Sequence, residues 1–207
     1  MLGFLFSNPI LFFVWLAALV VAITVHEFAH AWTAVRLGDP TPKIQGRLTL
    51  NPLAHMDPLG TLMLLVVRFG WGKPVQFDPF NLENPKRDAA IISLAGPVSN
   101  LIVAGGLSIL ARLGVPVIFV TPFIFLNVVL AVFNLLPIHP LDGGKILIGL
   151  LPPKDAAQVD IFLRQYGLFI LLLLIFPTWQ GMSPVSYLIN PVISFLLNLL
   201  LPGNGIM

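Results

Sequence analysis

The chain has 207 residues, of which 57% are hydrophobic and only 10% are charged, and its mean hydropathy is +0.93. A soluble domain carries about 25% charged residues, so this composition indicates an integral membrane protein. The formal net charge of +2 is too small to indicate a nucleic-acid partner, and the absence of cysteine excludes thiolate ligands, so any metal must be bound by His, Asp or Glu.

The first predicted span covers residues 9–37, more than the roughly 20 apolar residues that a helix needs to cross a bilayer. Pro9 suits the first turn of a helix, and Gly38-Asp39-Pro40 predicts that the helix stops there.

Three ionisable side chains lie late in this apolar span, in the motif His26-Glu27-Phe28-Ala29-His30. Histidines four residues apart share one face of a helix, so their imidazoles can bind one Zn²⁺ ion. Zinc lowers the pKa of a bound water to about 7, and the neighbouring Glu27 is placed to take that proton. Polar groups paired inside a helix bundle are the alternative, but ionisable groups within a membrane are costly and usually functional.

The segment after this span is polar and turn-rich up to residue 57. Alternating residues within 43–50 predict strands of a small hairpin, which could offer an edge to an extended substrate. Residues 59–69 are apolar but cover only about half a crossing, so we expect a re-entrant or half-buried segment that gates the site. His55 and Asp57 precede it and are candidate near-site residues; for His55 the alternative is a surface loop.

Further spans are predicted at residues 89–113, 116–136 and 159–176, and residues 186–201 form a last apolar segment that we also expect to cross. The fold class is therefore an all-α polytopic membrane protein with about five transmembrane helices. A re-entrant or half-span segment and a small β-hairpin region near the cytoplasmic face complete the prediction.

Asp142 is the best candidate for a third metal ligand, since a catalytic zinc usually has three protein ligands and one open position. It follows the span that begins at Pro116 and so arrives at the same membrane face as the end of the HExxH helix. The alternative is a turn residue in the sequence Leu-Asp-Gly-Gly.

Basic residues indicate the orientation, because loops rich in lysine and arginine favour the cytoplasm. If residues 38–88 begin and end on one side, nearly all basic residues share that side, and Arg112 alone lies opposite. The N-terminus is then outside and the site lies near the cytoplasmic side. The residues on the shared side are Arg36, Lys43, Arg47, Lys73, Lys86, Arg87, Lys145, Lys154 and Arg164.

Three motifs in order carry a resemblance to a known family: HEFAH at 26–30, LAGPVSN at 94–100 and FNLLPIHPLDGGKIL at 133–147. Together they resemble the site-2 protease family of intramembrane zinc metalloproteases, peptidase family M50, over roughly residues 10–150. The stretch GRLTLNPLAHMDPLGTL at 46–62 is similar to the compact prokaryotic branch that lacks PDZ and CBS domains.

The resemblance implies one zinc ion per chain, with His26, His30 and Asp142 as ligands and Glu27 as the base. It also implies that Asn134 stabilises the oxyanion or binds the substrate backbone; an amide can donate there without competing for zinc, although an interhelical hydrogen bond is the alternative. The substrate would be a transmembrane protein or peptide, cleaved in the lipid bilayer of a prokaryotic cell membrane.

On this basis residues 1–207 form a single intramembrane metalloprotease domain, with a catalytic core at about 9–150 and accessory helices at about 157–201. His139 stands where related sequences often carry proline, so we expect it near the ligands or at an interface rather than in an essential role. The oligomeric state is open.

Other functions also remain open at this point: a catalytically inactive family member, a membrane metal-binding or transport protein, or a metal-dependent hydrolase that acts on lipids. Residues 101–111 and 165–177 offer few polar side chains, which argues against a transport path.

Overall fold

The computed structural model describes residues 8–60, 63, 72–176 and 183–201. Within these residues the regular structure is helical, apart from an isolated antiparallel bridge between Met56 and Gly72. The elements are α2 (Pro9–Arg36), α3 (Thr41–Ile44), η1 (Pro52–Ala54), η2 (Pro79–Asn81), α5 (Pro85–Arg112), α6 (Val117–Asn134), α7 (Asp142–Leu150), α8 (Pro153–Ile175) and α9 (Pro184–Leu200).

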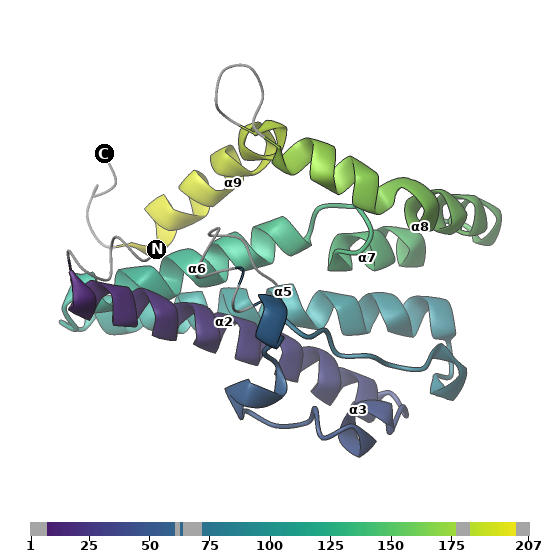
Figure 1. Cartoon of the computed structure of the whole chain (residues 1–207), viewed down its shortest axis with the longest axis horizontal. Coiled ribbons are helices and arrows are strands. Elements are labelled where there is room, and N and C mark those ends of the chain that lie inside the picture. Colours follow the sequence, from purple (N-terminus) through teal and green to yellow (C-terminus); the bar gives the residue numbers. More distant parts are fainter. Residues whose placement is uncertain (1–7, 61–62, 64–71, 177–182, 202–207) are drawn as a thin grey trace.

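The centre of the fold is a group of three mutually packed helices, α2, α5 and α6, which run side by side in Figure 1. Because α5 is antiparallel to both neighbours, the C-terminal ends of α2 and α6 meet the N-terminal end of α5. Helix α7 packs against this end of α5 and is followed by α8, whereas α9 returns to lie along α6.

Four of the described helices, α2, α5, α6 and α8, are long and apolar enough to cross a membrane. The chain is therefore an integral membrane protein, as its composition predicted. Helix α9 is also apolar but has only 17 residues, fewer than the about 20 that a perpendicular crossing requires. The expectation of about five spans is thus not supported by the described residues, which contain four.

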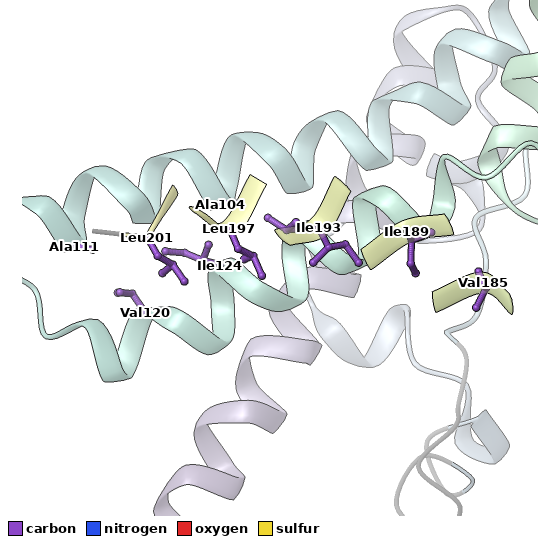
Figure 2. Close-up of a cluster of buried hydrophobic side chains, with 10 residues drawn as sticks. Ala104, Ala111, Val120, Ile124, Val185, Ile189, Ile193, Leu197 and Leu201 are labelled. Atoms are coloured by element: carbon purple, nitrogen blue, oxygen red, sulfur yellow. The ribbon is translucent and has the colours of Figure 1, made fainter. Parts of the chain in front are cut away.

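Helix α9 is attached to the central helices by an apolar stripe that repeats every four residues, Val185, Ile189, Ile193, Leu197 and Leu201. Residues four apart lie on one face of a helix, so these side chains all face inward. Figure 2 shows them against Ala104 and Ala111 of α5 and Val120 and Ile124 of α6.

The predicted strands at residues 43–50 are wrong. Thr41 to Ile44 form the short helix α3, and Gly46 turns the chain with a φ of +69°. The Asp39 carboxylate accepts hydrogen bonds from the backbone N–H and hydroxyl of Thr41, two residues on, which favours a turn, and Pro42 is well suited to a first helical turn. The alternation in this stretch was too short to outweigh these local signals.

The predicted half-span at residues 59–69 lies mostly outside the described residues, so the structure does not test it.

Asp39 joins two loops that lie near the end of α2. Its side chain is fully buried. One carboxylate oxygen accepts from Thr41 and from the Asn81 side chain, at 2.8 Å in the latter case, and the other accepts from the Asp78 backbone N–H at 2.8 Å. Burial would raise the pKa of Asp39, but the hydrogen bonds outweigh it and hold the pKa below its usual value.

Asp39→Ala should lower the free energy of unfolding by about 3 kcal/mol, because it leaves several donors without their charged acceptor. Since the folded-state pKa lies below 3.8, this contribution is present above pH 3.8 and is lost as the pH falls through the folded-state value. Unfolding in detergent at neutral and acidic pH checks both points. Asp155→Ala, at an exposed position on α8, is the control and should change stability by less than about 0.5 kcal/mol.

Candidate metal centre

His26, His30 and Asp142 lie together where α2 approaches the start of α7. The Nε2 atoms of His26 and His30 are 3.0 and 3.3 Å from the same oxygen of Asp142, Oδ2. One ligand atom from each residue lies within 4.8 Å of the other two, and both histidines are buried. Residues separated by more than 110 positions thus form a compact group of metal-binding atoms.

Each imidazole faces Asp142 with Nε2, and the hydrogen bond on its other side, at Nδ1, indicates which nitrogen carries the proton in the neutral ring. His30 Nδ1 lies 2.7 Å from the Ile92 carbonyl, which can only accept, so Nδ1 carries the proton. His26 Nδ1 lies 2.7 Å from Oδ1 of Asn100, which also only accepts. In their neutral forms both histidines therefore present unprotonated Nε2 atoms.

Two lone pairs and a carboxylate converge in this arrangement, and three acceptors cannot satisfy one another. A divalent cation would satisfy all three, and the set of two imidazoles and one carboxylate is a known zinc-binding combination. The donor chemistry of His26, His30 and Asp142 therefore fits a bound metal ion.

Asn100 of α5 has a central position in the helix packing. Its Nδ2 donates to the Ala22 carbonyl of α2 at 3.0 Å and to Oδ1 of Asn127 on α6 at 2.7 Å. These donations leave Oδ1 as the acceptor for His26 and so fix the orientation of the amide. Asn100 thus links three helices through its amide and also orients the His26 imidazole.

Gly96 lies on α5 opposite the two imidazoles. A Cβ atom at this position would lie 2.5 Å from Nε2 of His30 and 2.6 Å from Cε1 of His26, which is closer than real Cβ contacts allow. Only glycine lets α5 approach the histidines this closely. The nearest neighbours of Gly96 are thus the rings of the two candidate ligands.

Asp142 reaches the histidines through a tight turn between α6 and α7. A Cβ at Gly143 would lie 2.1 Å from the carbonyl oxygen of Leu136, so a larger residue would force the turn open. Burial would raise the pKa of Asp142, but donation from His26 and His30, when their Nε2 atoms carry protons and no metal is bound, holds it well below its usual range. Asp142 is therefore an ionised carboxylate.

His26, His30 and Asp142 line a cavity with a volume of about 110 Å³, and Glu27 and Asn134 line it as well. Oε2 of Glu27 accepts a hydrogen bond of 2.8 Å from the backbone N–H of Val75, so this carboxylate is oriented by a loop rather than by the metal ligands. Asn134 Nδ2 donates one of its two hydrogens to the Leu130 carbonyl at 3.0 Å. The second hydrogen is available to a ligand.

An extended segment, residues 73–78, passes beside the cavity and contributes Pro74, Val75 and Phe77 to its lining. Nη2 of the buried Arg47 donates to the carbonyls of Lys73 and Pro74 at 2.6 and 3.0 Å. With the bond to Glu27 and the bond from Asp78 to Asp39, the segment is held at both ends and in the middle.

Sequence reasoning missed two polar residues in the cavity, Ser93 and Lys145. The hydroxyl of Ser93 is buried and has no hydrogen-bond partner among the described residues. Lys145 was assigned only a role in topology, although it lies three residues after Asp142 and so on the same side of a helix, a signal that the sequence did contain. No local signal indicated residues 74–77.

His55, Asp57 and His139 are not among the residues that line this cavity. His55 is fully buried and its Nε2 lies 2.8 Å from the Thr49 carbonyl, and Asp57 accepts a hydrogen bond of 2.7 Å from the Gly60 backbone. His139 is partly buried, and its backbone approaches α8 at Gly167. The structure thus brings together five of the eight candidate residues.

Comparison with known proteins identifies relatives of this chain. Residues 108–174 match the family model described as peptidase family M50. YwhC of Bacillus subtilis (strain 168), named as a zinc metalloprotease, is 41% identical over 189 residues, which cover 85% of this chain and 84% of YwhC.

Two more distant relatives carry similar names. Rip2 of Mycobacterium tuberculosis (strain ATCC 25618 / H37Rv), also named as a zinc metalloprotease, is 35% identical over 80% of this chain and 68% of Rip2. Zinc metalloprotease MJ0392 of Methanocaldococcus jannaschii is 27% identical over 72% of this chain but only 37% of its own length. No solved structure shows a significant match.

Gly96→Ala should abolish metal binding, because its Cβ would displace both imidazoles. Metal analysis of the purified protein checks this. Gly106→Ala is the matched control, since it lies on the same helix with no atom within 4 Å of the added Cβ. A Gly96→Ala protein with full metal content would show that the rings can move without losing the site.

Asn100→Ala should weaken metal affinity by about 10- to 100-fold, because His26 loses the acceptor that fixes its tautomer. Competition with a chelator measures the affinity. Circular dichroism must show an intact helix content, since Asn100 also links three helices. Unchanged affinity in a folded variant would contradict the orienting role.

Proposed function

This chain belongs to peptidase family M50, and on that premise we propose that it is an intramembrane zinc endopeptidase. It would cleave peptide bonds within or near transmembrane segments of membrane proteins. The observation that carries the proposal is the convergence of His26, His30 and Asp142 beside Glu27, at one end of an apolar helix bundle. The zinc metalloprotease names of the relatives support the same choice of metal.

In this proposal one zinc ion per chain is held by Nε2 of His26, Nε2 of His30 and the Asp142 carboxylate. When bound, zinc supplies Lewis acidity, which polarises a carbonyl group and makes water more acidic.

The residues of the chain provide the proton transfers and the orientation. Glu27 takes a proton from the water that attacks the scissile carbonyl carbon, and a C–O bond forms. The C–N bond then breaks, and Glu27 delivers the proton to the leaving amine. The hydrogen bond from Val75 restricts the position of the Glu27 carboxylate, and Asn134 donates its free amide hydrogen to the carbonyl oxygen as negative charge develops there.

In this proposal water would reach the site from the side of the neighbouring loops. His26 and His30 lie in the C-terminal half of α2, and Asp142 begins α7 just after α6 ends, so the candidate ligands lie towards the loops that follow these two helices. These loops carry most of the basic residues, whereas Arg112 lies at the opposite end of α5. By the positive-inside rule the N-terminus would be outside the cell and the site near the cytoplasmic side.

Glu27→Gln should retain zinc and lose peptide hydrolysis, whereas Asp142→Ala should lose both. The measurement is zinc content combined with cleavage of a transmembrane peptide library in detergent, with and without a chelator. Glu83→Gln is a matched control, because Glu83 is the only other glutamate of the chain and is exposed.

Three outcomes separate the alternatives. Cleavage that survives the chelator or Glu27→Gln would contradict the mechanism. Zinc binding without cleavage by the wild type would favour a metal-binding protein or an inactive family member. Release of fatty acids from lipid without peptide cleavage would favour a lipid hydrolase.

A further inference from the structure

Lys145 places a positive charge in the wall of the catalytic cavity. It lies in α7, and its side chain lines the cavity together with the candidate ligands, Glu27 and Asn134. It is the only lysine or arginine among the residues that line this cavity. Its function is therefore not explained by topology alone.

The ammonium group of Lys145 lies over an aromatic ring, and among the described residues it donates no hydrogen bond. Nζ lies 4.5 Å from the centre of the Phe77 ring, a favourable position for a cation. The ion pairs among the described residues join the two ligand histidines to Asp142 and Arg164 to Asp160, so Lys145 forms none. An ammonium has three N–H donors, which can here bind an acceptor that enters the cavity.

The charges around the cavity favour an anionic ligand. Glu27 and Asp142 contribute two negative charges, which a bound divalent cation would neutralise, and the histidines are neutral when they present lone pairs to a metal. Lys145 then leaves one positive charge in excess, in a setting shielded from bulk water where such a charge acts strongly.

Peptide hydrolysis creates one negative charge at the acyl group, first on the oxygen of the tetrahedral species and then on the carboxylate of the new C-terminus. We propose that the Lys145 ammonium binds this acyl oxygen and is a further catalytic residue. This inference rests on the proposed function, since it assigns a partner to the charge which that reaction produces. Lys145 forms no covalent bond and transfers no proton; Glu27 carries the proton from water to amine.

The first test compares Lys145→Met with Lys145→Arg in the zinc-loaded protein. Lys145→Met should lower kcat by about 100-fold, as expected when one donor to an oxyanion is removed, with zinc content unchanged. Lys145→Arg keeps the charge and should restore most of the activity. Lys154→Met, an exposed lysine at the start of α8, is the control and should cleave like wild type. Lys145→Met with kcat within threefold of wild type would overturn the proposal.

The second test does not depend on cleavage. A peptide that ends at a cleavage site, or an apolar peptide if none is known, is made with a C-terminal carboxylate or carboxamide. Its affinity for the zinc-loaded protein is measured by calorimetry. Lys145→Met should weaken carboxylate binding by about tenfold, the loss expected for one charge-assisted hydrogen bond, and should leave carboxamide binding unchanged. Equal carboxylate affinity in wild type and Lys145→Met would overturn the proposal.

The two tests also separate this inference from the proposed function. If the wild type cleaves no peptide but loses carboxylate affinity on Lys145→Met, the protease assignment fails and the anion-binding role stands. If the wild type, Lys154→Met and the Lys145 variants all cleave equally well, the protease assignment stands and the role of Lys145 fails. Should Lys145→Met not fold, Lys145→Arg decides: it must retain the preference for carboxylate over carboxamide that the wild type shows.

Discussion

The site depends on two protons that point away from it. Nδ1 of His26 donates to Asn100 and Nδ1 of His30 donates to the Ile92 carbonyl, so in the neutral form of each ring the lone pair faces Asp142. In water either tautomer would be accessible, but here the alternative tautomer would set the Nδ1 lone pair of each ring against an oxygen that can only accept. Hydrogen bonds on the outer side of the cluster thus favour the neutral tautomers that a metal ion requires.

These hydrogen bonds in turn require the close packing of three helices. Asn100 donates to α2 and α6 simultaneously, and Gly96 allows α5 to come within contact of the imidazole rings. Asp142 joins from the far end of α6 through a turn in which Gly143 leaves no room for a side chain. The same residues therefore support the helix packing and the geometry of the candidate ligands, so a change in packing here would also change the candidate metal site.

Much of the fold and the site could be predicted because the signals were local or chemically rare. Long apolar runs marked the four spans. The HExxH motif in one of them left few candidates for a third ligand, and Asp142 was the candidate expected at the same end of the bundle as the motif. The strands at 43–50 were wrong because the Asp39 hydrogen bonds to Thr41 and the proline at position 42 favour a turn and a short helix over a short alternation. The contacts of Val75 with Glu27 and of Ile92 with His30 use backbone atoms, which no side-chain pattern can reveal.

The size of the cavity limits how a polypeptide can reach Glu27. A helix with its side chains is about 10–12 Å across, which far exceeds what a space of about 110 Å³ can admit, whereas an extended strand presents one peptide group at a time. Any chain that reacts there must already have given up its own backbone hydrogen bonds around the scissile link. Selectivity would then follow from how readily a membrane segment unravels, more than from which side chains flank the bond.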